Sequence, residues 1–515
     1  MLVKVYAGAT HGVKATLITI EVNIRAGVNL TIVGLPDSAV KESIQRIETA
    51  IINCGFKMPR MNIVVNMAPA DIKKEGSSYD LPIAIGILAA SNQVSIEKLD
   101  KYLIMGELAL DGKIRPIKGT LPIAMYAKEK NFRGFILPHE NVMEASVVRG
   151  IEAIPVSSLQ EVIDFLNGIR CIEPVSNDIA LLFGNGTAQY DVDFSEIKGQ
   201  KYVKRAMEIA AAGAHNILMI GPPGAGKTMI ARRLPTILPP LTLEEALETT
   251  VIYSVAGKMP PGCGLIVTRP FRAPHHTISE VALVGGGQTP RPGEISLAHN
   301  GVLFLDELPE FPRTVLEVLR QPLEDRYLVI SRSKYSVEYP CNFMLVASMN
   351  PCPCGYLNHP AKSCNCTINE IRRYLQKVSG PLMDRIDIHI EVMPVSISEI
   401  QDMPQDTENS ATIRTKVIKA REIQRKRFAG LKGIYANSHI PPKLINEFCR
   451  IDDKCKEILK MAMEKLSLSA RAYDKILKVA RTIADLDDSE KIEVPHISEA
   501  IQYRSLDKER WLVKE

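Results

Sequence analysis

The first third of the chain alternates between segments with strand-like and helix-like spacing of apolar residues. Residues 16–22 alternate apolar and polar side chains, which is typical of a half-buried strand. Residues 38–54 repeat apolar side chains every three or four positions, which predicts a helix. The further elements that we expect here are strands over 28–33, 62–67 and 134–137, a strand and turn over 106–112, and helices over 80–90 and 122–130. The pattern predicts an α+β domain over residues 1–170.

The middle of the chain contains short apolar runs of strand length. Residues 216–220, 301–305 and 342–347 predict buried strands. Apolar strands separated by helices are typical of a doubly wound sheet that is covered on both faces. We therefore expect an α/β domain over residues 193–393. The stretch 171–192, which is polar and contains proline and glycine, predicts a linker in front of it.

The last part of the chain, residues 394–515, predicts a helical domain. Residues 401–410 have the composition of a flexible connection, and helical spacing follows over 413–428, 453–466 and 469–486. One face of the last helix is apolar and carries Tyr473, Ile476, Leu477, Ala480 and Ile483. This face is expected to pack on the rest of the domain.

One stretch in the middle domain carries a specific chemical signature. Residues 221–228 match the phosphate-binding loop pattern G-x-x-x-x-G-K-[ST] at every required position. They are Gly221, Pro222, Pro223, Gly224, Ala225, Gly226, Lys227 and Thr228. The glycines permit a tight turn whose N–H groups point at phosphate oxygens. Lys227 is expected to reach the β and γ phosphates of ATP, and Thr228 to bind Mg²⁺.

Two acidic residues follow the predicted strand over 301–305. Asp306 and Glu307 stand at its carboxyl end, where ligands bind in open α/β sheets. Asp306 is expected to hold the Mg²⁺ shell. Glu307 is expected to orient and polarise the attacking water, because catalysis of phosphoryl transfer consists mostly of positioning and charge stabilisation. With the phosphate loop about 80 residues upstream, the pair predicts an ATPase.

Composition and charge indicate neither a membrane protein nor a secreted one. The chain has 515 residues, of which 46% are hydrophobic and 24% charged, and a net charge of +4. This charge is too small to identify a polyanionic partner, so a nucleic-acid surface must be local. The longest apolar run, residues 81–90, is too short for a membrane helix, and the first residues lack the pattern of a signal peptide. We expect a cytoplasmic protein whose ten cysteines are thiols or metal ligands.

Four cysteines lie within fifteen residues of one another. They form two C-x-C pairs separated by nine residues: Cys352, Cys354, Cys364 and Cys366. Four thiolates make a closed tetrahedral Zn²⁺ site, although the usual spacing is C-x-x-C. The sequence leaves two interpretations open, a zinc site and packed reduced thiols, with His359 as an alternative ligand.

Two segments of the front domain resemble the proteolytic domain of Lon-type proteases. They are Met105-Gly-Glu-Leu-Ala-Leu-Asp-Gly-Lys-Ile-Arg-Pro-Ile-Lys-Gly119 and Lys74-Glu-Gly-Ser-Ser-Tyr-Asp80. The resemblance places Ser78 at the position of the nucleophile, but Leu121 at that of the lysine base. Because a serine without a base is a weak nucleophile, we predict a Lon-like fold without the peptidase dyad.

From residue 194 onwards the order of features resembles that of an AAA+ ATPase. The resemblance places Asn350 at the first sensor, which contacts the γ-phosphate and the water. Arg385 is our choice for the arginine finger, which a subunit supplies in trans to the ATP of its neighbour. Arg372 and Arg373 are the next candidates. The alternative interpretation of Arg385 is a surface ion pair with the neighbouring Asp384 or Asp387. Arg471, in the first turn of the last long helix, is expected to be the second sensor, because a cation there opposes the helix dipole unless an anion lies nearby.

Nearly the whole chain closely resembles the YifB/ComM group of Mg-chelatase-like AAA+ ATPases. The segments that carry the resemblance are Arg269-Pro-Phe-Arg-Ala-Pro-His-His276, Pro292-Gly-Glu-Ile-Ser-Leu-Ala-His299, Asn350-Pro-Cys-Pro-Cys-Gly355 and Lys478-Val-Ala-Arg-Thr-Ile-Ala-Asp-Leu486. The resemblance implies three parts: a Lon-protease-like α+β domain, an AAA+ P-loop α/β domain, and a C-terminal helical lid. It also implies an oligomeric ring, expected to be a hexamer, with ATP and Mg²⁺ as cofactors.

For ComM members the resemblance implies an ATP-driven helicase that promotes branch migration on DNA. Local support comes from residues 327–339, which predict two strands joined by a turn with Arg332 and Lys334 near the tip. Such a hairpin in a ring pore can grip phosphates, although an ordinary hairpin with solvated cations has the same pattern. Two other functions stay open: a magnesium-chelatase motor subunit, and a protein-remodelling ATPase whose front domain binds a protein partner.

Overall fold

The computed structural model describes residues 1–177, 190–287, 290–332, 335–395 and 408–506. The chain forms two compact units. The first comprises Met1–Thr187, Thr242–Val267 and Pro290–Pro292, and the second comprises Ala188–Leu241, Thr268–Thr289 and Gly293–Glu515. No helix within the described ranges is long and apolar enough to cross a membrane.

The first unit is built on a seven-stranded mixed sheet. In spatial order its strands are β3 (Leu30–Val33), β4 (Asn62–Ala68), β2 (Lys14–Arg25), β1 (Leu2–His11), β5 (Tyr102–Ile104), β8 (Gly134–Pro138) and β9 (Glu152–Val156). β2 runs antiparallel to both β1 and β4, and the other neighbours are parallel. A short hairpin, β6 (Glu107–Leu108) and β7 (Ile114–Arg115), occupies the segment expected to form a strand and turn.

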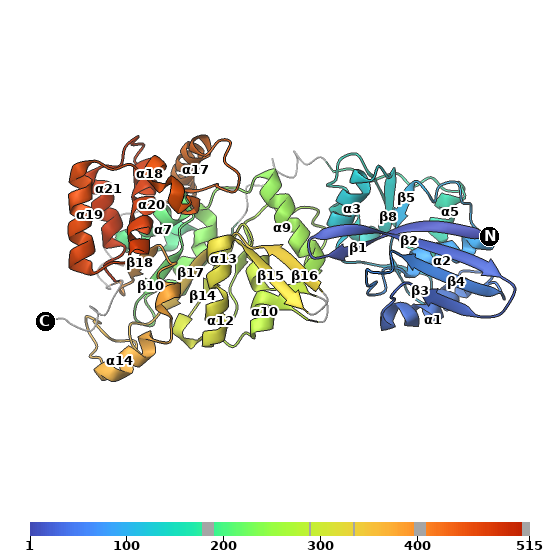
Figure 1. The fold of residues 1–515 in the computed structure, drawn as a ribbon, viewed down its shortest axis with the longest axis horizontal. Helices are drawn as coiled ribbons and strands as arrows, with labels where there is room; N and C mark the ends of the chain where they lie inside the picture. Colours follow the sequence, from blue (N-terminus) through green and yellow to red (C-terminus); the bar gives the residue numbers. More distant parts are fainter. Residues whose placement is uncertain (178–189, 288–289, 333–334, 396–407, 507–515) are drawn as a thin grey trace. The chain divides into compact units, whose positions relative to one another are not determined.

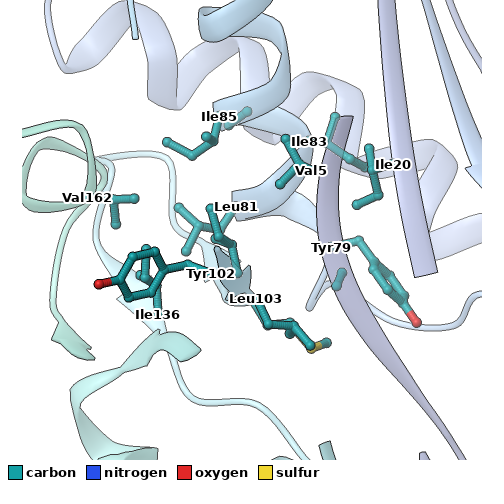
Figure 2. Packing of buried hydrophobic residues seen from close by; sticks show 14 of the residues in the cluster. Val5, Ile20, Tyr79, Leu81, Ile83, Ile85, Tyr102, Leu103, Ile136 and Val162 are labelled. Atoms are coloured by element: carbon teal, nitrogen blue, oxygen red, sulfur yellow. The ribbon is translucent and has the colours of Figure 1, made fainter. Parts of the chain in front are cut away.

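A wholly buried helix forms the centre of this unit. Every residue of α2 (Asp80–Ala90) is buried, as its apolar character on all sides predicts. Figure 2 shows side chains of its first half among those of the sheet, Val5 and Ile20 included. Gly86 permits this approach, because a Cβ there would lie 2.6 Å from Cγ2 of Val22.

Besides α2 and the short α4 (Val142–Ala145), four longer helices pack in the described part of the first unit. They are α1 (Ser38–Asn53), α3 (Thr120–Glu129), α5 (Leu159–Leu166) and α9 (Leu243–Ala256). α9 comes from residues 242–267, which lie within the segment 193–393 where the sequence predicts the ATPase domain. It packs against α3, and Ser254 accepts hydrogen bonds from the N–H groups of Gly119 (3.0 Å) and Leu121 (3.4 Å). One segment of the middle region therefore belongs to the first unit.

The second unit contains a five-stranded parallel sheet. Its strands are, in spatial order, β11 (Phe271–Arg272), β14 (Val302–Leu305), β17 (Met344–Met349), β10 (Ile217–Ile220) and β18 (Ile388–Glu391). The three central strands are wholly buried, in agreement with their continuous apolar sequences. Helices α7 (Lys201–Gly213) and α8 (Lys227–Arg233) flank β10 in the sequence. The strands expected over 216–220, 301–305 and 342–347 are thus confirmed.

The C-terminal helices share a hydrophobic core with this sheet. They are α17 (Ser410–Arg427), α18 (Pro442–Phe448), α19 (Asp453–Leu466), α20 (Ala470–Leu486) and α21 (Val494–Gln502), and α21 lies against both α19 and α20 (Figure 1). A buried carboxylate ties them together: Asp485 accepts bonds from Arg427 at 2.5 Å and from Arg481 and Asn437 at 3.1 and 2.7 Å. These contacts hold α17 and α20 to each other and to the segment between α17 and α18.

Candidate nucleotide site

The phosphate-binding loop connects β10 to α8. Gly224 and Gly226 have φ angles of 81° and 89°, in the region where glycine is favoured over residues with a Cβ. At Gly221 a Cβ would lie 2.1 Å from the carbonyl oxygen of Val392, so a side chain there would clash with the backbone that follows β18. All three glycines of the motif are therefore required by the backbone path as well as by the approach of phosphate.

Lys227 is folded onto the loop that carries it. Its Nζ donates to the carbonyl oxygens of Gly221 (2.6 Å) and Pro222 (2.9 Å) and to Oδ1 of Asn350 (3.1 Å). Burial lowers the pKa of this ammonium, and the nearby carboxylates of Asp306 and Glu307 oppose the shift. A buried cation held by neutral oxygens has a strong electrostatic preference for an anionic ligand.

Asp306 accepts hydrogen bonds from one residue of α8 and one residue of β17. Oγ1 of Thr228 donates to Oδ2 of Asp306 at 2.7 Å, and Oγ of Ser348, in β17, donates to its other oxygen. Ser348 also accepts a bond from the backbone N–H of Glu307 at 3.3 Å. A hydroxyl and a carboxylate at this distance are oxygen ligands of the kind that Mg²⁺ takes at nucleotide phosphates.

Glu307 has an uncommon backbone conformation, with φ of 55°. Its side chain is exposed, and one carboxylate oxygen lies 3.7 Å from Nδ1 of His276. The ring of His276 lies against that of His275, with centroids 4.1 Å apart and the ring planes tilted by 33°. A non-glycine residue in the left-handed region often marks a functional site, and here it presents the carboxylate beside the phosphate loop.

These residues fit a nucleotide with its magnesium ion. By their chemistry the loop N–H groups and Lys227 can bind phosphate, and Thr228 and Asp306, which are hydrogen-bonded to each other, can bind Mg²⁺. The sequence predicted this set, and the structure brings its members together at the carboxyl ends of β10, β14 and β17.

Two polar residues of the site were not assigned a role from the sequence. Ser348 supports both acids, as described above, and Gln200 donates to the carbonyl oxygens of Ala225 (3.1 Å) and Met393 (2.8 Å). Gln200 therefore joins the phosphate loop to the segment after β18. Neither residue belongs to the phosphate-loop motif. The sequence could have pointed to them only through their positions, Ser348 directly after a predicted buried strand and Gln200 just before a helix.

Arg385 lies at the other end of the sheet. Its carbonyl oxygen accepts from Nδ2 of Asn216 (3.3 Å), which stands just before β10, whereas the phosphate loop follows that strand. The four residues of β10 span about 13 Å. The side chain is 9% exposed, with Nη2 2.7 Å from Oε1 of Glu324 and Nη1 donating to the carbonyl oxygen of Pro381. Its carboxylate partner is thus Glu324, rather than one of the two neighbouring aspartates.

Arg471 is exposed in the first turn of α20, whose N-cap is Ser469. The same helix makes an ion pair with Asp387, the residue that immediately precedes β18. Nζ of Lys475 lies 2.6 Å from Oδ1 of Asp387. Burial opposes ionisation of Asp387, but Lys475 and His215 outweigh it and hold its pKa well below the usual range. This pair links the helix that carries Arg471 to the segment that carries Arg385.

The predicted basic hairpin forms β15 (Tyr327–Arg332) and β16 (Tyr335–Pro340), which pair in antiparallel register from Tyr327 opposite Pro340 to Arg332 opposite Tyr335. The structure describes the backbone of Arg332, the last residue of β15, but not its side chain. Lys334 lies outside the described residues. The two strands are confirmed, and the DNA contacts stay a prediction.

The position predicted for a peptidase base is apolar and buried. Leu121 is fully buried at the start of α3, and its N–H donates to Oε1 of Glu144 at 2.9 Å. Lys74, close to Ser78 in sequence, donates its Nζ to the carbonyl oxygens of Gly34 and Pro69, and burial lowers its pKa. Among the described contacts, no base is therefore engaged with Ser78.

The four clustered cysteines follow Asn350 directly and lie together in space. His359 is not a member of this cluster, and its Nδ1 instead accepts bonds from the backbone N–H groups of Ala361 (3.0 Å) and Lys362 (3.1 Å).

Three family models match the chain. Residues 193–400 match the model described as magnesium chelatase, subunit ChlI; residues 20–141 match subunit ChlI of Mg-chelatase; and residues 407–504 match the C-terminal part of that subunit. Together they cover parts of the front, middle and helical regions.

Individual relatives extend over nearly the full length. The chain is 45% identical to competence protein ComM of Haemophilus influenzae over 503 residues, which are 98% of this chain and 97% of the relative. It is 43% identical to the uncharacterized protein YifB of Escherichia coli, with the same coverage. The match to Lon protease 2 of Bacillus subtilis is 31% over 128 residues, 25% of this chain and 23% of the protease. The fold is thus a Lon-like α+β domain, an AAA+ α/β domain and a helical C-terminal domain.

Proposed function

We propose that this chain, which belongs to the ComM/YifB-like members of the magnesium chelatase subunit ChlI family, is an ATP-hydrolysing ring motor that acts on DNA. The observation that supports the ATPase is that the two adjacent residues at the end of the phosphate loop are each hydrogen-bonded to a predicted site residue, Lys227 to Asn350 and Thr228 to Asp306. The observation that supports DNA as the substrate is the nearly full-length similarity to a protein named for competence.

Hydrolysis at this site uses the chain's residues as follows. Lys227 exchanges its carbonyl partners for phosphate oxygens and neutralises charge on them. Glu307 orients a water molecule in line with the terminal phosphate, and Asn350 holds that water and the γ-phosphate. Thr228 and Asp306 would hold Mg²⁺, whose charge would offset that of the phosphates. Chemistry of this kind depends on positioning, which Ser348 and Gln200 support.

The site is completed by a second subunit. The arginine finger cannot come from Arg385 of the same chain, because that residue stands at the amino ends of the strands, about 13 Å from the loop along β10. A neighbouring copy in a ring, proposed to be a hexamer, supplies its own Arg385 to the terminal phosphate. Arg471 of the helical domain contacts the same phosphate as the second sensor.

We expect Arg385→Ala to retain ATP binding and to lower the ATPase rate by about 10³-fold, the usual effect of removing an arginine finger. Mixing this variant with Lys227→Ala protein is expected to restore part of the rate. In a mixed ring, some ATP sites combine the intact phosphate loop of an Arg385→Ala subunit with the intact Arg385 of a Lys227→Ala neighbour. Steady-state turnover of mixtures at several ratios measures the effect.

Two comparison variants make this test specific. Glu324→Gln removes the ion pair of Arg385 but leaves its guanidinium, so it is expected to keep most of the ATPase rate. Arg373→Ala, on exposed α14 (Ile368–Leu375), tests the alternative finger. Absence of rescue on mixing, or an equal loss in Glu324→Gln, would show that Arg385 acts through its ion pair within the chain.

The hairpin β15–β16 is proposed as the DNA grip. We expect the double variant Arg332→Ala, Lys334→Ala to bind single-stranded DNA more weakly, and the slope of log affinity against log salt concentration to fall by about 1 to 2. Fluorescence anisotropy with a labelled oligonucleotide at several salt concentrations measures both quantities. Lys454→Ala, Lys460→Ala, on exposed positions of α19, removes the same charge elsewhere. Equal affinities of the two double variants would exclude the hairpin as the grip.

The second candidate is a magnesium-chelatase motor subunit, favoured by the descriptions of the three family models. It predicts an ATPase that responds to partner subunits and is indifferent to DNA. A protein-remodelling ATPase makes the same prediction about DNA, with the Lon-like unit as the binding site for a protein.

A further inference from the structure

Four sulfur atoms converge immediately after the sensor residue Asn350. Sγ of Cys352 lies 3.3 Å from that of Cys354 and 3.6 Å from that of Cys364, and the last two are 3.5 Å apart. Cys366 completes the group, in which all four sulfurs lie within 4.8 Å of one another. A tetrahedral Zn²⁺ with Zn–S bonds of about 2.3 Å holds its sulfurs about 3.8 Å apart. The spacing of the cluster is close to this value.

The backbone supports the sulfurs in the manner of a thiolate site. The N–H of Cys354 points to Sγ of Cys366 at 3.4 Å, and the N–H of Leu357 points to Sγ of Cys352 at the same distance. Thiolate sulfurs bound to a metal accept such bonds, which fix the ligand orientation and offset the negative charge. A set of four packed thiols has no such requirement.

The segment that carries the four cysteines has no secondary structure of its own. Between β17, which ends at Met349, and α14, which begins at Ile368, the structure contains no helix or strand. Of the four cysteines only Cys352 is fully buried. A metal bound by both ends of a connection that has no secondary structure of its own can hold it in one conformation. A bound ion would link both C-x-C pairs in this way.

We propose that Cys352, Cys354, Cys364 and Cys366 bind one structural Zn²⁺, which holds the loop after β17 against the phosphate-binding loop. Four protein ligands close the coordination sphere, so the ion takes no part in the chemistry. The ligands bind as thiolates, and their protons pass to solvent.

The contact with the nucleotide site comes from the residue that follows the first cysteine pair. A Cβ on Gly355 would lie 2.7 Å from Cδ of Pro223 and 3.9 Å from Cγ of Asn350. The backbone of the cysteine loop therefore lies directly against the phosphate loop and beside the sensor. An ion that fixes this loop also fixes Asn350, whose Oδ1 accepts from Lys227. This consequence for catalysis rests on the proposed ATPase, whereas the metal site does not.

The primary test is metal analysis of the full-length protein, purified without chelator and examined by inductively coupled plasma mass spectrometry. About one zinc per chain is expected. Cys354→Ser and Cys364→Ser are expected to lose it, whereas Cys263→Ser, a half-buried cysteine outside the cluster, retains it. Folded wild-type protein without zinc, or zinc retained in both cluster variants, would overturn the site.

A second measurement avoids the variants, which are expected to be less stable. Protein expressed with Co²⁺ in place of Zn²⁺ should show the visible d–d bands and thiolate charge-transfer band of tetrahedral sulfur coordination. Spectra without these bands, in protein that holds the cobalt, would exclude a four-thiolate site. Neither readout depends on ATP hydrolysis.

The link to catalysis has its own readout. Removal of the zinc by a chelator under reducing conditions is expected to lower kcat for ATP by about tenfold, while binding of a fluorescent nucleotide changes little. Restoring Zn²⁺ should restore kcat. Zinc at one per chain with kcat unaffected by its removal would retain the site but overturn its role in placing Asn350.

Discussion

Lys227→Ala is expected to lower ATP turnover by about 10³-fold or more and to weaken nucleotide binding. The ammonium is buried among carbonyl oxygens that offer no counter-charge, and burial lowers its pKa. Phosphate is the ligand that satisfies it, so the variant loses the main cationic contact to the β and γ phosphates. Steady-state ATPase rates together with titration of a fluorescent ATP analogue measure both effects.

The matched control for this variant is Lys201→Ala. Lys201 is exposed at the start of α7, so its removal is expected to leave turnover unchanged. The buried ammonium of Lys227 carries a desolvation cost in the free protein, so its replacement should not lower the melting temperature appreciably. Turnover at the wild-type rate in Lys227→Ala would remove the phosphate loop from the proposed mechanism.

Glu307→Gln is expected to bind ATP with nearly unchanged affinity and to hydrolyse it about 10² to 10³ times more slowly. The amide has the size of the carboxylate and adopts the same backbone conformation, but it cannot polarise water. The variant should accumulate as an ATP-bound oligomer, which size-exclusion chromatography with ATP and light scattering detect.

The control lies three residues further along the chain. Glu310→Gln changes an equally exposed carboxylate that pairs with Lys377 at 3.2 Å, outside the nucleotide site. It is expected to hydrolyse ATP at the wild-type rate. If Glu307→Gln behaved in the same way, the water-orienting role would pass to another group, and His276, 3.7 Å from Glu307, would be the next to test.

Much of the candidate nucleotide site was predictable, because most of its residues belong to short sequence motifs. The loop over 221–228 needs its glycines for the backbone path, and Asp306 and Glu307 follow a strand whose apolar run is unmistakable. In a parallel sheet these segments must meet at the carboxyl ends of their strands. The structure confirms that meeting through the 2.7 Å bond between Thr228 and Asp306.

Other features depend on contacts between residues distant in sequence, which periodicity does not reveal. The partner of Arg385 is Glu324, 61 positions away, rather than an adjacent aspartate. The helix α9 lies between two motifs of the ATPase but packs in the Lon-like unit through Ser254. The strands β1, β5 and β9 were also not predicted, because β5 has only three residues and the other two follow no clean alternation.

In the Lon-like unit, Leu121 occupies the position at which the resemblance to Lon-type proteases places the lysine base. At Leu121 the side chain is fully buried, and its backbone N–H donates to Oγ of Ser254 in α9 at 3.4 Å. The absence of peptidase chemistry from this unit stays a prediction from the sequence.

The measurement that tests the account most directly is the steady-state ATPase rate with and without single-stranded DNA, at low and at moderate salt, with Lys227→Ala as the control. A DNA motor predicts a clear rise in rate on addition of DNA, reduced at the higher salt because phosphate contacts are displaced by counterions. A rate of hydrolysis that is the same with and without DNA at both salt concentrations would contradict the proposed function.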